Sequence, residues 1–587
     1  EKGIVVTTGN SLTIYAQSGG TGTLNATGTT DSSNNASAGI GGSTTIFDSG
    51  SITIHGGVIN ATGGASRWYS GAGIGGSTPS SGNGGNSGTI KIYGGTITAE
   101  SRGFSVGAGI GGGGSGGTGN GGAGTNISIY GGNITAMSYS DNNGGAGIGG
   151  GSGQTNGGTG NITIGGGTIH STGGSLGAGI GGGSGGTQSG NGTVTISGGK
   201  VTAVGGNYAA GIGGGGGYKS QYLTWIGGIG SVTITGGIVD AKGNGSGEYA
   251  GAPIGNGGNT TAAATVNKTT GIVFENGAGT VCGDVTLDGS YTVPGDYTLN
   301  IPVGASLSGS GTLSGGGAFT TENLTEDMIS VPTDFYYNGE DRTTELTEAV
   351  AINGGVTICG QTFTVRGWSV TVSKTDDLHY TATYTNESDN TKNFTKTITL
   401  QKSGTDLTSE GKVQTYKGDT LTKDFTASDT ITVKATPTAT GEAPANSAMF
   451  AASFTGPGAG QMAVFVGDTQ VSAPADKGAD GTYTMTVSAA DVLAAAGGPG
   501  TGITLTAKFV GNNNMADAAG TVNVNISAVA KVEKYGSTTY VGALADAFTE
   551  GNSGATVTLL SEVDLGSNYI GIRGSSTFTL DLNGQTV

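Results

Sequence analysis

The stretch AGIGGSTTIFDSGSITIHGGVINATGG, residues 38–64, contains every element of a unit that recurs along the first half of the chain. Its AGIG core returns at spacings of 32 to 42 residues. The isoleucines of these cores, including a variant APIG at the end, are Ile40, Ile74, Ile110, Ile148, Ile180, Ile212 and Ile254. A period of this size is typical of repeat proteins in which each unit packs only against its neighbours.

Two alternating segments accompany each AGIG core. The first reads SITIH from Ser51 and returns as SLTIY from Ser11, TIKIY from Thr89 and four further versions. The second usually follows a Gly-Gly corner and keeps an aliphatic residue at a constant position: Leu24, Ile59, Ile97, Ile134, Ile169, Val201 and Val239. Alternation of β-branched and polar residues is typical of a strand with one buried face.

Three short strands per unit, with glycine at the bends, predict one rung of a parallel β-helix whose rungs stack about 4.8 Å apart. We therefore expect an all-β chain that begins with a right-handed parallel β-helix of about seven GAGIGG rungs plus a cap. A β-sandwich is the competing fold. It would not repeat its inward side chains in register seven times along the sequence.

Glycine supplies 126 of the 587 residues, but there is no Gly-X-Y period and there are only 10 prolines, which excludes collagen. The hydrophobic share of 34% argues against wholesale disorder. The two cysteines, Cys282 and Cys359, have neither zinc-ligand spacing nor the density of a disulfide-rich scaffold. Glycine must therefore punctuate a folded repeat that is held together by packing.

The net charge is −17, and residues 1–265 contain seven basic and seven acidic residues, so the whole acidic excess follows them. Neither part offers a basic patch, so we expect no binding to nucleic acid. No apolar run approaches the roughly 18 residues that a membrane span needs, so we expect no membrane insertion. We expect a soluble, monomeric fragment of a longer protein.

The composition changes along the chain and indicates four segments. Residues 1–325 are expected to form the Gly-rich β-helix, with the stretch from Asp284 to Leu313 as its atypical last turns. Residues 326–403 and 404–530 alternate like the strands of small β-sandwiches. Residues 531–587 combine a short helical segment, TTYVGALADAF, with new strands.

Residues 404–530 resemble a bacterial Ig-like domain in three motifs: FVGD at Phe465–Asp468, GTYTMTV from Gly481 and FVGNNNMADAAGTVNVNI from Phe509. Residues 326–403 are similar to a further Ig-like module from the same kind of surface protein. Residues 531–587 resemble the N-terminal cap and first turn of a second β-helix, truncated at Val587. The resemblance implies two Ig-like β-sandwich domains followed by the start of a second β-helix.

Many parallel β-helices are polysaccharide lyases or hydrolases, so paired carboxylates are the first feature to test. The acids of the Gly-rich segment are scattered, and only Asp240 and Glu248 share a rung at a useful distance. The oxygen-rich loop Asp141-Asn142-Asn143 suits calcium, but turn-forming Asn and Asp residues explain the same letters. We expect no catalytic residues and no cofactor, with Asp141 as a weak candidate for calcium.

Aromatic residues recur at two positions of the rung. Tyr15, His55, Tyr93 and Tyr130 follow the first strand, whereas Trp68, Tyr69, Phe104, Tyr139, Tyr208 and Tyr249 precede the AGIG strand. Stacked rungs turn each position into a stripe, and exposed apolar stripes usually mark binding sites. The alternative is that the rings stack on one another and seal the corners. Trp68, Tyr69, Tyr93 and Tyr130 are candidate ligand-binding residues.

One loop breaks the pattern of the glycine spacers. GYKSQYLTWI from Gly217 lengthens the sixth unit, and insertions in repeat proteins tend to decorate a binding face. Tyr218, Tyr222 and Trp225 are therefore candidate ligand-binding residues. The alternative is that this loop folds over the end of the rod as a plug.

The GAGIGG rungs resemble the glycine-rich β-helices of secreted and cell-surface proteins from clostridia and other gut Firmicutes, some of which bind carbohydrate. The resemblance implies a non-enzymatic extracellular adhesin or stalk, secreted or attached to the cell wall, whose β-helix binds a glycan or host glycoprotein while Ig-like domains act as spacers. Two alternatives stay open. One is a polysaccharide-degrading β-helix enzyme, and the other is a module that binds a host protein.

Overall fold

The computed structural model describes residues 3–17, 22–219, 224–337, 340–440, 460–512 and 515–587 of the 587-residue chain. The chain divides into two compact units. Unit 1 contains Glu1–Met328, Ile352–Trp368 and Asn386–Asn390. Unit 2 contains Ile329–Ala351, Ser369–Thr385 and Thr391–Val587.

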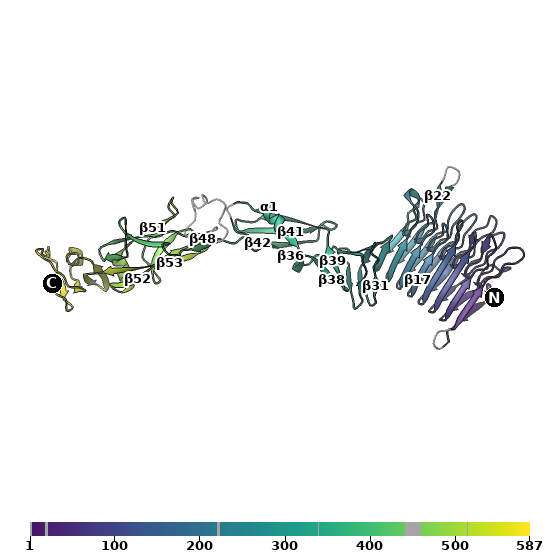
Figure 1. Ribbon diagram of the computed structural model, residues 1–587, viewed down its shortest axis with the longest axis horizontal. Coiled ribbons are helices and arrows are strands. Elements are labelled where there is room, and N and C mark those ends of the chain that lie inside the picture. The colour runs from purple at the N-terminus through teal and green to yellow at the C-terminus, as the bar shows by residue number, and fades with distance from the viewer. Residues whose placement is uncertain (1–2, 18–21, 220–223, 338–339, 441–459, 513–514) are drawn as a thin grey trace. The chain divides into compact units, whose positions relative to one another are not determined.

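Unit 1 is dominated by a parallel β-solenoid of about eight turns whose strands form three sheets (Figure 1). The AGIG sheet contains β1 (Ile4–Val5), β4 (Ile40–Gly41), β8 (Ile74–Gly75), β12 (Ile110–Gly111), β15 (Ile148–Gly149), β18 (Ile180–Gly181), β21 (Ile212–Gly213) and β26 (Ile254–Gly255). The first-strand sheet contains β2 (Ser11–Ile14), β5 (Ser51–Ile54), β9 (Ile90–Ile92), β13 (Gly124–Ile129), β16 (Gly160–Ile164), β19 (Gly192–Ile196), β24 (Gly230–Ile234) and β27 (Thr265–Lys268). The second-strand sheet begins with β3 (Thr23–Thr27), β6 (Val58–Thr62), β10 (Thr96–Arg102), β14 (Asn133–Tyr139), β17 (Thr168–Thr172), β20 (Lys200–Val204) and β25 (Ile238–Lys242).

Equivalent positions of successive repeats pair in register. Ile52 lies beside Ile90 in the first-strand sheet, and Ile110 lies beside Ile148 in the AGIG sheet. This register confirms the predicted parallel solenoid. The predicted AGIG strands are present in seven rungs, and β1 and β27 extend two of the sheets to eight strands without carrying the AGIG motif.

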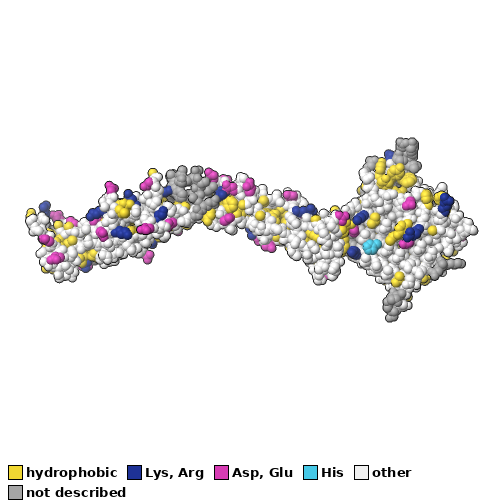
Figure 2. Space-filling view, in the orientation of Figure 1, with side chains coloured by type: hydrophobic (Ala, Val, Ile, Leu, Met, Phe, Trp, Pro, Cys, Tyr) yellow, Lys and Arg dark blue, Asp and Glu magenta, His cyan; other side chains and the backbone are white. Residues whose placement is uncertain are grey.

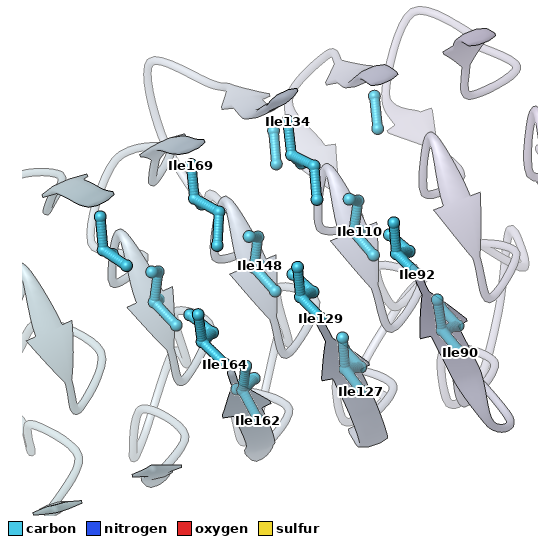
Figure 3. Packing of buried hydrophobic residues seen from close by; sticks show 14 of the residues in the cluster. Ile90, Ile92, Ile110, Ile127, Ile129, Ile134, Ile148, Ile162, Ile164 and Ile169 are labelled. Atoms are coloured by element: carbon cyan, nitrogen blue, oxygen red, sulfur yellow. The ribbon is translucent and has the colours of Figure 1, made fainter. Parts of the chain in front are cut away.

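The interior of the solenoid is filled by columns of aliphatic side chains (Figure 3). Ile90, Ile127 and Ile162 occupy one position in three successive rungs, and each is at most 1% exposed. Burying an isoleucine contributes about 1.5–3 kcal/mol before the entropy of ordering it is subtracted. Because each rung repeats these residues, the core side chains of one rung pack against equivalent side chains of the rungs before and after it.

After the AGIG isoleucine of each rung, glycine lets the backbones of neighbouring rungs pack directly against each other, with no side chain between them. Gly149 has a φ of +137°, and a Cβ at this position would lie 2.0 Å from the carbonyl oxygen of Gly181 in the next rung. The Gly-rich loops also bond to one another through their backbones. Gly122 donates to Gly113 within one loop, and Gly151 of the next rung donates to Gly122, at 2.8 and 2.9 Å. The two halves of each Gly-rich loop are thus hydrogen-bonded to each other and to the loop of the next rung.

At strand β28 (Gly271–Glu275) both faces of the second-strand sheet are buried. Val273 points into the solenoid interior, whereas Ile272 and Phe274 belong to a separate hydrophobic cluster, the cap core, on the opposite face. The sheet continues antiparallel into β29 (Ala278–Cys282). Beyond it lie β32 (Thr298–Ile301), β35 (Ala318–Thr321), β39 (Gln361–Val365) and β38 (Gly355–Ile358).

Short parallel turns follow this reversal, as the sequence from Asp284 predicts. Strand β30 (Asp284–Thr286) pairs in parallel with β33 (Ser306–Ser308), and β31 (Tyr291–Thr292) pairs in parallel with β34 (Leu313–Ser314). Their side chains, among them Tyr291 and Leu313, fill the cap core.

Unit 2 is built from sheets whose strands pair mostly antiparallel, with little helix. One sheet contains β40 (Trp368–Lys374), β41 (His379–Asn386) and β42 (Asn393–Thr399), and helix α1 (Thr343–Ala349) precedes it in the chain. Two further sheets share one hydrophobic core. They consist of β45 (Thr420–Leu421), β44 (Val413–Lys417), β47 (Thr430–Ala435) and β51 (Tyr483–Ser488), and of β46 (Asp424–Thr426), β53 (Ala518–Ser527), β52 (Gly500–Phe509), β49 (Met462–Val466) and β50 (Thr469–Gln470). The identification of these sheets as Ig-like domains stays a prediction.

The last segment has a small core of its own. Strands β54 (Ala530–Lys534), β55 (Ser537–Val541), β56 (Thr556–Leu559) and β57 (Thr579–Asp581) form its sheet. The expected short helix is present as α3 (Leu544–Ala547), and β56 pairs with β57 in parallel. The interpretation of this segment as the start of a second β-helix stays a prediction.

Candidate functional site

The inserted loop of the sixth unit forms a β-hairpin on the solenoid. Strand β22 (Tyr218–Lys219) pairs antiparallel with β23 (Thr224–Trp225), and Tyr218 lies directly opposite Trp225. The hairpin lies between β21 and β24 in the chain and is labelled through β22 in Figure 1. Directly opposed aromatic side chains are among the strongest cross-strand pairs.

Backbone contacts to the neighbouring rungs hold the base of this hairpin. The amide of Ile226 donates to the carbonyl oxygen of Thr187 at 3.0 Å, and the amide of Ser189 donates to Ile226 at 2.8 Å. On the other side, the Asn259 Nδ2 donates to the carbonyl oxygen of Trp225 at 2.7 Å. The hairpin is therefore hydrogen-bonded to both the preceding and the following rung.

Four rings meet at the hairpin and form what we call the hairpin cluster: Tyr208, Tyr218, Trp225 and Tyr249. Tyr218 stacks on Tyr208, with ring centroids 5.7 Å apart and planes 13° apart. It meets Trp225 and Tyr249 edge-on, at centroid distances of 5.7 and 6.3 Å. All four side chains are partly exposed. Figure 2 shows hydrophobic side chains gathered at the base of this hairpin.

Tyr208 is held in an unusual backbone conformation. Its φ is +57°, in the left-handed region that bulky residues rarely occupy. The ring lies against Gly245, where a Cβ would come within 2.8 Å of Tyr208 Cδ1. Strain of this kind costs of order 1–3 kcal/mol and tends to collect at functional positions.

The structure brings together two of the three loop residues that the sequence selects. Tyr218 and Trp225 belong to the hairpin cluster, whereas Tyr222 lies outside the described residues. Sequence reasoning recognised Tyr208 and Tyr249 as members of an aromatic column but did not select them as ligand-binding residues. Tyr208 and Tyr249 lie on the sixth and seventh rungs, on either side of the insertion in the sequence, and this position could have indicated that they contact it.

The column Tyr15, His55, Tyr93 and Tyr130 forms a stacked ladder. Successive ring centroids are 4.5, 4.9 and 5.1 Å apart, and interplanar angles do not exceed 18°. Both faces of Tyr93 are covered by neighbouring rings, and the far side of Tyr130 lies over Gly165, where a Cβ would be 3.3 Å from Tyr130 Cδ1. Tyr93 and Tyr130 therefore offer ring edges, rather than ring faces, to a ligand.

Trp68 and Tyr69 lie in a tight turn at the corner of the second rung. The amide of Ser66 donates to the carbonyl oxygen of Tyr69 at 2.8 Å, and the Ser66 hydroxyl accepts from the amide of Tyr69 at 3.0 Å. Arg67 and Trp68 are the two central residues of this turn. Trp68 is 48% exposed, whereas Tyr69 is partly buried at the start of β7 (Tyr69–Ser70).

Two arginines flank aromatic rings on this corner. The Arg67 guanidinium carbon lies 5.0 Å from the centroid of the Trp68 ring, and Trp68 meets Phe104 of the next rung edge-on at 5.7 Å. On the third and fourth rungs, Arg102 lies 4.0 Å from the centroid of the Tyr139 ring. A hydrogen bond from Arg102 to Glu100 raises the pKa of the guanidinium.

Of the two acids that the sequence places on one rung, the structure describes the side chain of Asp240. Tyr297 donates a hydrogen bond to Asp240 Oδ2 at 3.0 Å, and partial burial raises the pKa of the Asp240 carboxyl. The side chain of Glu248 lies outside the described residues. Asp141 is exposed, and within the described ranges no three His, Cys, Asp or Glu side chains are grouped as a metal site would require. No helix in the same ranges is long and apolar enough to span a membrane.

The three stacked sheets and their in-register columns define a parallel β-solenoid repeat protein. Five segments of the chain match the family model described as Beta helix repeat, at residues 52–78, 90–114, 127–152, 162–184 and 194–216. Each segment runs from the first strand of a rung to just past its AGIG strand. A comparison with curated proteins and a comparison with solved structures each gave no match.

Proposed function

We propose that the solenoid is a non-enzymatic glycan-binding module of an extracellular bacterial surface protein, either an adhesin or a stalk, and that the sandwich modules of unit 2 act as spacers. The hairpin cluster carries this proposal. Partly exposed aromatic rings on a surface of Gly, Ser, Thr and Asn offer flat apolar faces beside hydroxyl and amide groups. That combination suits a sugar, which presents C–H faces and hydroxyl groups together.

The support for a binding role comes from the construction of the cluster. Among the described glycine loops of the solenoid, this is the one that carries a pair of antiparallel strands. It is fastened to two rungs through Thr187, Ser189 and Asn259, so its rings are ordered before a ligand arrives. Preorganised rings lose little entropy on binding.

The test is a glycan array with the full chain, followed by calorimetry with the best ligand. Changing Tyr218 and Trp225 together to Ala should weaken binding by about thirtyfold or more, because a buried aromatic anchor contributes about 2 kcal/mol. Tyr130→Ala is the control, since it removes a ring of the ladder that is more exposed than either hairpin ring and lies on another rung. Lys219→Ala, on the hairpin itself, should leave binding within about twofold.

The alternatives give different outcomes in the same experiment. A host protein as ligand predicts that binding to an intact glycoprotein survives enzymatic deglycosylation and free competing sugars. A polysaccharide-degrading enzyme predicts shortening of the bound glycan during incubation. Equal binding by the wild type and the Tyr218/Trp225 double variant would remove the hairpin from the proposal.

A further inference from the structure

We propose that a second site on the solenoid binds sulfated sugars. This inference rests on the proposed function, because it takes a glycan as the ligand. The site consists of Arg67, Trp68, Arg102, Phe104 and Tyr139, which we call the arginine–aromatic patch. It lies on the second, third and fourth rungs, whereas the hairpin cluster lies on the sixth and seventh.

Backbone pairing between rungs brings the five residues together. The amide of Ser105 donates to the carbonyl oxygen of Trp68 at 2.8 Å, which sets Phe104 beside Trp68. Arg102 pairs directly with Tyr139 at the ends of β10 and β14. These two strands have seven residues each, whereas the neighbouring strands β6 and β17 have five. The extra residues carry Arg102 and Tyr139 past the end of the regular sheet.

The rings of the patch are open to solvent. Trp68, Phe104 and Tyr139 are 48%, 39% and 38% exposed, although each is large and apolar. Arg67 and Arg102 each lie over one ring, and such a contact orients the planar guanidinium. The patch therefore combines exposed ring surface with preoriented cationic donors.

The two arginines differ in how many donors they have to offer. Within the described part of the chain, no carboxylate lies within ion-pair distance of Arg67. Arg102 uses Nε and Nη2 to bind Glu100 Oε2, at 3.0 and 2.8 Å, so its Nη1 lies outside this ion pair. One full guanidinium fork and one additional donor are thus presented on adjacent rungs.

This donor set favours a sulfate ester over a carboxylate. A carboxylate has two oxygens, and a single guanidinium fork satisfies both. A sulfate ester has three terminal oxygens in a tetrahedral arrangement, so the third oxygen needs a donor from another direction. In the proposed complex, Arg102 of the third rung supplies that donor in addition to the fork of Arg67, while the exposed rings cover the sugar that carries the ester.

The net charge of the chain is negative, so binding of a sulfated sugar has to come from the arginines of the patch itself. The chain has a net charge of −17, which repels polyanions at long range. The Gly-rich segment has only seven basic residues in 265, and two of them lie in the patch. Binding of a sulfated polymer by this protein is therefore not expected from general electrostatic attraction.

The experiment compares three polymers with one backbone: dextran sulfate, carboxymethyl dextran of matched charge density and unmodified dextran. The full chain should bind dextran sulfate at least about tenfold more tightly than carboxymethyl dextran, and it should bind unmodified dextran least. Raising the ionic strength from 50 to 300 mM should weaken the binding, because the contacts are exposed and screened.

Arg67→Gln should weaken dextran sulfate binding by about tenfold, since it removes a charge-assisted pair of hydrogen bonds. Arg67→Lys keeps the charge but loses the planar fork, so it should recover only part of the affinity. Lys91→Gln is the control, because it removes the same charge from an exposed position on β9 of the third rung. Thermal unfolding of each variant checks that the solenoid is intact.

Separate variants distinguish this inference from the proposed function. The Tyr218/Trp225 double variant should bind dextran sulfate like the wild type, whatever its effect on array ligands. Equal affinity for carboxymethyl dextran and dextran sulfate would overturn the choice of sulfate. Equal losses for Arg67→Gln and Lys91→Gln, or a lower melting temperature without loss of affinity in Arg67→Gln, would overturn the site itself.

Discussion

The solenoid of unit 1 and the two-sheet sandwich of unit 2 place their aromatic side chains in opposite ways. The buried solenoid core consists of Ile, Val and Ala, and the rings lie at the corners. The sandwich core includes Phe425, Tyr483 and Phe509. Identical aliphatic residues fill identical layers in a stacked repeat, whereas the uneven gap between two twisted sheets needs large rings. Aromatic residues of a solenoid are therefore free for other uses.

Glycine provides the strongest test of this comparison. Gly149 of the solenoid and Gly498 of unit 2 have similar φ values, +137° and +145°. A Cβ would lie 2.0 Å from a backbone oxygen at Gly149 but 3.5 Å from the nearest atom, Tyr540 Oη, at Gly498. We expect Gly149→Ala to lower the free energy of unfolding by about 4 kcal/mol or more and Gly498→Ala by about 1–3 kcal/mol. Calorimetry that resolves the transitions of the two units measures both, and equal losses would contradict the close packing of the rungs.

The same change of tyrosine in the two regions should differ in effect. Tyr483 is 2% exposed and donates to the carbonyl oxygen of Gly460 at 2.7 Å, and burial raises its pKa to about 12. Tyr483→Ala should cost about 3–5 kcal/mol, whereas Tyr93→Ala in the ladder should cost only about 0.5–1.5 kcal/mol. Denaturant unfolding of both variants tests this. A loss at Tyr93 as large as that at Tyr483 would mean that the ladder is part of the core.

The columns of the solenoid could be predicted because one residue type recurs at a fixed offset. Ile52, Ile90 and Ile127 needed only alternation and a repeat to be placed side by side. The arginine–aromatic patch could not be found in this way. Its contacts depend on the Ser66–Tyr69 turn and on two extra residues in β10, and neither feature has a period in the sequence.

The hairpin was recognisable as an interruption, but its partners were not. Tyr208 reaches Tyr218 through a left-handed backbone conformation that tyrosine rarely adopts, so no propensity favours it. The reversal at β28 was also missed, although GIVFE is a continuous apolar run, which is typical of a strand covered on both faces.

The smallest expected effect concerns a charge beside the cap core. Burial raises the pKa of Asp240 above its ordinary value of 3.8, while the hydrogen bond from Tyr297 and the charge of Lys242 oppose the shift. The folded state thus holds this proton more tightly than the unfolded state, so ionisation of Asp240 costs stability as the pH rises through the folded pKa. Asp240→Asn should raise the melting temperature slightly at pH 7, and the difference should vanish below pH 3.8.

Melting curves of unit 1 at pH 7 and pH 3, with Asp141→Asn as an exposed control, measure this change. A lower melting temperature for Asp240→Asn at pH 7 would show that the hydrogen bond from Tyr297 and the charge of Lys242 together outweigh the cost of burial.

Strand β28 has a consequence for how the solenoid comes apart. It pairs with β25 on one side and with β29 on the other, and its two faces are covered by different cores. Stacked repeats normally fray from their ends, one unit at a time. If either the solenoid core or the cap core unfolds, the other core still packs against one face of β28. Its amide protons should therefore be among the slowest in unit 1 to exchange with solvent, and a pulling force that peels the cap would be passed directly to the last full rung.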